Sequence, residues 1–179
     1  MIKAVTIDYD LNIFINADYS IHSGSCIAHQ VHELTDIHDQ YGGFPKSYDS
    51  GNTLIRQLWW DETQIDYKDL GNQLGMEIVT ISSILQPPGN VIPLHRDTFF
   101  QINKRFPDDT RLKVRANMYL KNWSVGEFIQ YEINNEWHNS THWRAGEGWM
   151  WDSTHLHVSA NAGMRDKYTL QISGFLNRD

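Results

Sequence analysis

The second half of the sequence is a succession of short segments of β-strand type, and this pattern constrains the fold more than any other feature. Residues 77–85 are rich in β-branched side chains and end at Pro87-Pro88-Gly89, which cannot continue a strand. Residues 112–120 alternate between apolar and polar side chains, so the two sets lie on opposite faces of a sheet. Further strands are expected at 126–133, 137–143, 148–152, 156–160 and 167–175. Many short strands separated by Gly and Asn predict a β-sandwich or jelly roll.

The first 75 residues show a more mixed pattern. Leu54 and Leu58 lie four residues apart, as on one face of a helix, so we expect a helix over residues 53–60. A second helix is expected to end at Leu74, because Gly75 follows it.

The length of 179 residues suits one domain. We interpret residues 1–75, with an expected short strand at 3–7, as a wrapping of helices and strands around a β-rich core at 76–179. The predicted fold class is therefore mainly β with flanking helices.

The composition excludes several classes of protein. Cys26 is the single cysteine, which excludes a disulfide framework and a cysteine-rich zinc site. The N-terminal residues lack the apolar stretch of a signal peptide, and no run approaches the roughly 20 apolar residues that span a membrane. We therefore expect a cytoplasmic protein with no membrane partner. The net charge is −7 and the basic residues are scattered, which disfavours a nucleic-acid partner.

His95 and Asp97 form the first candidate pair of metal ligands. Residues two apart on an extended chain point the same way, so both side chains can reach one metal ion. The pair follows the proline turn that ends the strand at 77–85. A chain with nine histidines also contains such a pair by chance, so the third ligand decides the interpretation.

Four downstream histidines are candidates for that third ligand. They are His138, His142, His155 and His157. The first two lie in a polar hairpin, which indicates surface positions. His155 and His157 lie two residues apart and can face the same way, so the spacing does not choose between them.

The last expected strand carries polar residues on one face. Lys167, Thr169 and Gln171 alternate with apolar residues, and a lysine with a hydroxyl two residues away can bind a carboxylate. The alternative is that Lys167 is a solvated lysine at the end of a strand.

Residues 84–97 and 142–174 resemble the 2-oxoglutarate/Fe(II)-dependent dioxygenase superfamily, near its aspartyl/asparaginyl hydroxylase-like and prolyl-hydroxylase-like branches. The His-x-Asp motif of that family falls on His95 and Asp97. Its distal histidine, which is followed four residues later by Asn in these branches, falls on His157.

The family's basic residue for the far carboxylate of 2-oxoglutarate comes about ten residues after the distal histidine. That position is Lys167, and the accompanying hydroxyl is Thr169. Many members have Arg where this chain has Lys, and Arg165 is the rival residue if His155 were the iron ligand.

The resemblance implies a double-stranded β-helix, the cupin-like jelly roll, with iron held by His95, Asp97 and His157. It also implies that Fe(II), 2-oxoglutarate and O2 serve as cofactor and cosubstrates. The expected reaction hydroxylates a small molecule or a peptide side chain and releases succinate and CO2.

Three polar residues of the strand at 112–120 are candidates for contact with 2-oxoglutarate or the substrate. They are Arg115, Asn117 and Tyr119, and the alternative is that they lie on an exposed face of the sheet. A second hypothesis for the whole chain is a cupin-like metal-binding protein without oxygenase turnover. A third, in which the histidines are incidental, requires that the three proposed iron ligands do not meet in space.

Overall fold

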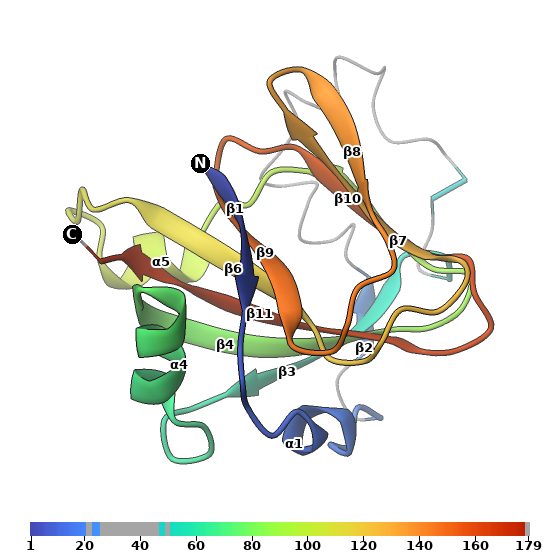
Figure 1. Cartoon of the computed structure of the whole chain (residues 1–179), viewed down its shortest axis with the longest axis horizontal. Helices are drawn as coiled ribbons and strands as arrows, with labels where there is room; N and C mark the ends of the chain where they lie inside the picture. The colour runs from blue at the N-terminus through green and yellow to red at the C-terminus, as the bar shows by residue number, and fades with distance from the viewer. Residues whose placement is uncertain (21–22, 26–46, 49–50, 178–179) are drawn as a thin grey trace.

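The computed structural model describes residues 1–20, 23–25, 47–48 and 51–177 of the chain (Figure 1). Its elements are β1 (Ile2–Thr6), α1 (Asn12–Ile15), β2 (Ser23–Ser25), β3 (Leu54–Trp60), α4 (Tyr67–Leu74), β4 (Met76–Gln86), β5 (Val91–His95), α5 (Phe100–Arg105), β6 (Lys113–Tyr119), β7 (Glu127–Ile133), β8 (Glu136–Ser140), β9 (Glu147–Asp152), β10 (His157–Asn161) and β11 (Lys167–Leu176).

The strands form two antiparallel sheets. The larger has the order β1-β9-β6-β11-β4-β3-β2, and the smaller has the order β5-β10-β7-β8. Strands far apart in the sequence therefore pair as neighbours, as β5 does with β10. This arrangement is the double-stranded β-helix that the resemblance implied.

The main hydrophobic core lies on the outer face of the large sheet, where α1 and α4 cover it (Figure 1). Phe14 of α1 and Leu70 of α4 pack there against Val114, Met118 and Ile172 from β6 and β11. A second, largely aromatic cluster lies on the inner face, between the two sheets. The helices thus stabilise one face of the large sheet and leave its other face to the candidate site.

The alternation predicted along residues 112–120 is confirmed in β6. Val114, Ala116 and Met118 are fully buried in the main core, whereas Arg115 and Tyr119 lie on the inner face. The sequence parity of this strand therefore assigns each side chain to the correct face of the sheet.

The predicted end of a helix at Leu74 is confirmed, and the nearby turn and cap residues fit their local geometry. Asn134 and Asn135 have φ of 53° and 64° in the turn between β7 and β8. Asp66 caps the N-terminus of α4 by accepting from the backbone N–H of Asp69, and Gly75 ends the helix with φ of 68°.

The helix predicted over residues 53–60 is wrong, because Leu54–Trp60 forms strand β3 and pairs with β4. A spacing of four residues places Leu54 and Leu58 on one face of a strand as well as of a helix, so the pattern did not discriminate. Pairing with β4 decides the conformation.

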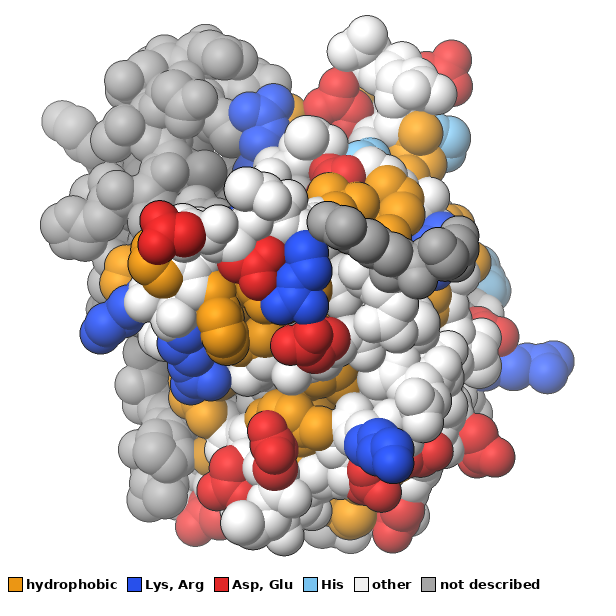
Figure 2. Space-filling model, turned by 90° about the vertical axis from the view of Figure 1, so that its left-hand side faces the viewer, with side chains coloured by type: hydrophobic (Ala, Val, Ile, Leu, Met, Phe, Trp, Pro, Cys, Tyr) orange, Lys and Arg blue, Asp and Glu red, His pale blue; other side chains and the backbone are white. Residues whose placement is uncertain are grey.

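Within the described residues, no helix has the length and apolar character needed to cross a membrane. The face drawn in Figure 2 carries acidic and basic side chains interspersed with hydrophobic ones, without a continuous basic surface. This face therefore offers no electrostatic stripe of the kind that follows a phosphate backbone.

Candidate metal centre

His95 and His157 are brought together by the pairing of two strands that are distant in sequence. β5 pairs antiparallel with β10, and His95 stands opposite His157 in the register. Their ring centroids are 4.1 Å apart. Asp97 follows two residues after His95, and the candidate ligand atoms of all three residues lie within 4.8 Å of one another. The structure thus places the three predicted ligands in one cluster.

Hydrogen bonds to backbone carbonyl groups orient both imidazole rings. His95 Nδ1 lies 2.8 Å from the Pro93 carbonyl oxygen, and His157 Nδ1 lies 3.2 Å from the carbonyl oxygen of His155. Because a carbonyl oxygen only accepts, Nδ1 carries the proton in each bond and leaves the Nε2 lone pair available. This is the tautomer that a metal ligand requires.

The protonation states also suit a metal ion. Burial lowers the pKa of His95 to about 3, and burial likewise lowers the pKa of His157. Burial alone would raise the pKa of Asp97, but the Arg115 guanidinium and the two imidazoles bring it down to about 2. At neutral pH the cluster therefore offers two neutral imidazoles and one carboxylate.

The two oxygens of Asp97 face different partners. Oδ1 accepts a hydrogen bond from Arg115 Nη1, and Oδ2 accepts one from Trp151 Nε1 at 2.7 Å. Oδ2 is also the oxygen that lies 3.9 Å from His157 Nε2. One carboxylate oxygen is thus directed to the imidazoles while the other is held by an ion pair.

The other candidate histidines lie outside this cluster. His155 Nδ1 is 3.1 Å from Asp152 Oδ1, and His142 stacks on Trp123 with ring centroids 4.1 Å apart. His138 lies on β8 at the end of the small sheet. Asp152, the partner of His155, does not belong to the cluster either.

Lys167 is buried in the interior, with 2% of its surface exposed. Its Nζ donates to Ser159 Oγ at 2.7 Å and to the carbonyl oxygens of Phe128 and Ala160 at 2.8 and 3.4 Å. Burial lowers the pKa of Lys167 to about 7. The rival residue Arg165 is exposed. Lys167 is therefore not a solvated lysine at a strand end.

The remaining predicted residues lie on the same inner face. Thr169 stands opposite Tyr119 in the pairing of β11 with β6, and both are buried. The Tyr119 hydroxyl donates to Ser140 Oγ at 2.6 Å. Asn117 is 7% exposed, and its Nδ2 is buried without a hydrogen-bond partner. A buried amide donor without an acceptor is costly, so this position suits a bound acceptor such as a carboxylate.

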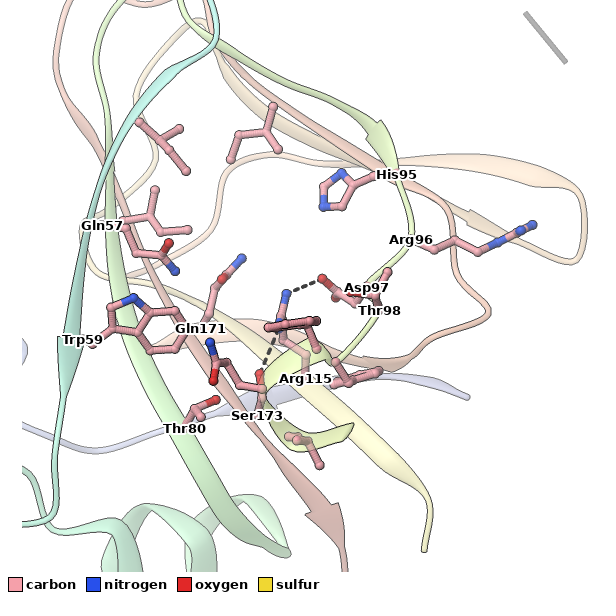
Figure 3. Close-up of a pocket in the computed structure, with 17 residues that line it drawn as sticks. Gln57, Trp59, Thr80, His95, Arg96, Asp97, Thr98, Arg115, Gln171 and Ser173 are labelled. Atoms are coloured by element: carbon pink, nitrogen blue, oxygen red, sulfur yellow. Dashed lines mark hydrogen bonds and ion pairs between the residues drawn. The ribbon is translucent and has the colours of Figure 1, made fainter. Parts of the chain in front are cut away.

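A cavity of about 210 Å³ adjoins the cluster, and Lys167 is not among the residues that line it. His95, Asp97 and Arg115 border it at one end, and residues of β3, β4, α5 and β11 form the rest. Figure 3 shows Gln57 and Trp59 pointing toward the same space as Arg115. The cluster therefore has access to a space large enough for a small molecule or one side chain.

Two further residues contact this site and were not predicted from the sequence. Trp151 is 1% exposed and packs in the core, and its indole N–H also donates to Asp97. Ser173 binds Arg115 Nε at 2.9 Å, and it shares the strand parity of Lys167 and Thr169, which could have identified it.

Comparison with protein-family models and with curated proteins gives no significant sequence match. Solved structures with a similar fold include a prolyl-4-hydroxylase from Pseudomonas putida, with a TM-score of 0.55 and 20% identity over 100% of this chain and 92% of that one. The α-ketoglutarate-dependent, non-heme enzymes SnoN, an epimerase, and SnoK, a carbocyclase, both from nogalamycin biosynthesis, have TM-scores of 0.56 and 0.57. SnoN is 12% identical, with the match covering 96% of this chain and 76% of the SnoN chain. SnoK is 8% identical, with the match covering 97% of this chain and 79% of the SnoK chain.

The chain shares the fold of these enzymes. This agrees with the resemblance found in the sequence, because α-ketoglutarate is another name for 2-oxoglutarate. In this fold His95, Asp97 and His157 form a group that could hold a metal ion. The binding roles of the individual residues remain predictions.

Proposed function

We propose that this chain is an Fe(II)- and 2-oxoglutarate-dependent oxygenase that hydroxylates a small molecule or a protein side chain. The observation that carries the proposal is the cluster of His95, Asp97 and His157, whose ligand atoms lie within 4.8 Å of one another. Two neutral imidazoles and one carboxylate form the donor set that non-heme Fe(II) oxygenases use. The fold shared with α-ketoglutarate-dependent enzymes supports the same assignment.

The interior between the cluster and Lys167 suits 2-oxoglutarate. Asn117 supplies a buried amide donor that has no protein acceptor, and Lys167 supplies a buried amine. The three hydrogen bonds of Lys167 Nζ go to protein oxygens, so a carboxylate would replace the longest, to Ala160. Thr169 and Tyr119 border the same interior. Arg115 contacts Asp97 and borders the cavity, so it can reach either the cosubstrate or the substrate.

Iron with bound 2-oxoglutarate and O2 would supply the oxidising chemistry, with succinate, CO2 and a hydroxylated product as the outcome. The chain's own residues would hold and shield this chemistry. Trp151 fixes the carboxylate ligand, and the buried aromatic cluster of Tyr119, Tyr131, Trp143 and Trp151 excludes water from the interior.

The test is the visible metal-to-ligand charge-transfer band of the protein with Fe(II) and 2-oxoglutarate under anaerobic conditions. We expect the band in the parent protein and in the His155→Ala control, and its loss in His157→Ala. Lys167→Ala should require roughly tenfold more 2-oxoglutarate, because a charge-assisted hydrogen bond is lost, whereas Arg165→Ala should not. A folded parent protein that binds Fe(II) but gives no band would contradict the proposal and favour a cupin-like metal-binding protein.

A further inference from the structure

The cavity beside the metal cluster is lined by polar and aromatic side chains. Arg115 and Gln171 line it from β6 and β11, whereas Trp59 and Phe100 line it from β3 and α5. Trp59 and Phe100 are 54% and 55% exposed, so each offers an aromatic surface to an incoming molecule. A ligand of this cavity therefore meets aromatic rings and a guanidinium group.

Arg115 has hydrogen-bonding capacity left over. Its Nε donates to Ser173 Oγ and its Nη1 to Asp97 Oδ1, whereas its Nη2 donates to no acceptor within the described part of the chain. The side chain is 20% exposed and borders the cavity. The ion pair with Asp97 fixes the direction of the guanidinium group, so the remaining N–H groups are held ready for a ligand without a large loss of side-chain entropy.

The charges around the cavity favour an anion. Apart from Asp97, which pairs with Arg115, no carboxylate lines it among the described residues, and the Arg115 guanidinium borders it. Arg96 points away from the cavity in Figure 3, and its Nε donates to the Thr154 carbonyl oxygen at 3.2 Å. The amide of Gln171 binds no described residue and adds a second donor beside Arg115. A cation held by Asp97 would make the net charge beside Arg115 positive.

We infer that the substrate is a small carboxylic acid with a flat apolar body, whose carboxylate binds Arg115 and whose body lies against Trp59 and Phe100. That the bound molecule is the substrate rests on the proposed function. The cavity volume of about 210 Å³ fits a single ring with a short acidic arm better than an extended peptide. Arg115 is then a specificity-determining residue, while Lys167 stays with the cosubstrate.

The test compares phenylacetate with its neutral counterpart phenylacetamide, using the full chain loaded with Zn(II) and saturating 2-oxoglutarate. Binding is followed by the NMR signal of the Trp59 indole N–H, assigned through Trp59→Phe. We expect phenylacetate to bind about tenfold or more tightly than the amide, because a charge-assisted hydrogen bond contributes about 1.5–3 kcal/mol. Arg115→Gln should abolish this preference. Trp59→Ala, titrated through the NMR signals of the probes themselves, should weaken the binding of both probes.

Matched variants separate this role from a general loss of charge or structure. Arg111→Gln removes the same charge from a site outside the cavity, and Trp137→Phe alters another half-exposed tryptophan, so both should keep the preference. Zn(II) affinity and circular dichroism check that Arg115→Gln retains the metal cluster and the fold. If Arg115→Gln does not fold, Gln171→Ala, which is expected to reduce the preference, provides the second test.

Several outcomes would overturn the inference. Two of them concern the parent protein's affinities: equal affinity for the two probes, and no binding of either probe up to the order of 20 mM. Two concern the variants: a preference for phenylacetate that survives in Arg115→Gln, and one that disappears in Arg96→Gln. The last is displacement of 2-oxoglutarate by phenylacetate. Binding of a capped glutamate tripeptide in place of phenylacetate would overturn the flat apolar body. The titration is repeated without metal and 2-oxoglutarate. The metal-free protein could still prefer phenylacetate through Arg115 while the iron protein gives no charge-transfer band. That combination would support the anion site and contradict the proposed oxygenase.

Discussion

At the scale of single residues, the environment of Asp97 shows how a buried carboxylate is kept ionised and in place. Its side chain is 1% exposed, and an unpaired charge at such a site would be strongly destabilising. Arg115 compensates the charge, and the Trp151 indole N–H fixes the second oxygen at 2.7 Å. The carboxylate therefore cannot rotate away from the two imidazoles without breaking two hydrogen bonds.

Trp151→Phe isolates the contribution of the indole N–H. The change keeps an aromatic ring in the core but removes the hydrogen bond to Asp97 Oδ2. We expect affinity for Fe(II) or Zn(II) to fall by roughly tenfold or more, as for other groups that orient metal ligands. A competition titration with a coloured chelator measures this affinity. Trp149→Phe, on the same strand, loses only a 3.3 Å hydrogen bond to Ser140 and serves as the control. Equal affinities of the two variants would contradict the orienting role.

The same residues show what the sequence could predict. His95 and Asp97 are two residues apart, so strand geometry alone places them together. The choice of His157 over His155 depends on the pairing of β10 with β5, which no local pattern encodes, and only the family resemblance supplied it. The indole donor of Trp151 could not be predicted, because a buried Trp in a core pattern gives no indication of where its N–H points.

At the scale of elements, alternation along β6 and β11 assigns the inner and outer faces correctly because one face is buried against α1 and α4. β3 was mistaken for a helix because its spacing of leucines fits both conformations. In the structure, Ile55, Gln57 and Trp59 of β3 all border the cavity, as alternate residues of a strand do. The conformation of β3 depends on its pairing with β4, which lies more than a dozen residues further along the chain. A window of eight residues does not contain that partner.

Close packing between β9 and β6 depends on Gly148. A side chain at this position would overlap the carbonyl oxygen of Asn117 and the Cα of Met118. We expect Gly148→Ala to lower the free energy of unfolding by roughly 1–3 kcal/mol, because the two strands must separate. Because Asn117 lies on the inner face, the same change should also weaken 2-oxoglutarate binding if the proposed cosubstrate site is correct.

Urea denaturation measures the stability of Gly148→Ala. The control is Gly75→Asn, since no atom lies within 4 Å of the added Cβ and Asn tolerates the left-handed backbone there. We expect that control to change stability by less than about 1 kcal/mol. A Gly148→Ala protein as stable as the parent would show that β9 and β6 can move apart without cost.

At the scale of the whole molecule, burial of Lys167 links folding to pH. The pKa of this amine is about 7 in the folded protein and 10.5 as its ordinary value, so the unfolded chain binds more protons between these limits. Stability of the metal-free protein should therefore rise with pH across this window, by up to about 1.4 kcal/mol per pH unit. Above roughly pH 10 the trend should reverse, because burial raises the pKa of Tyr119 and the unfolded chain then loses its tyrosine protons first.

Lys167→Met tests this linkage, because it keeps the length of the side chain and removes the titrating group. Urea denaturation of the parent and the variant between pH 7 and pH 9.5 gives a difference in which the other titrating groups cancel. We expect Lys167→Met to be more stable than the parent at pH 7 and to lose that advantage toward pH 9.5. Lys121→Met, a change at an exposed lysine, should keep the parent's slope. A Lys167→Met protein with the same pH dependence as the parent would mean that the buried amine stays charged, held by its three oxygen acceptors.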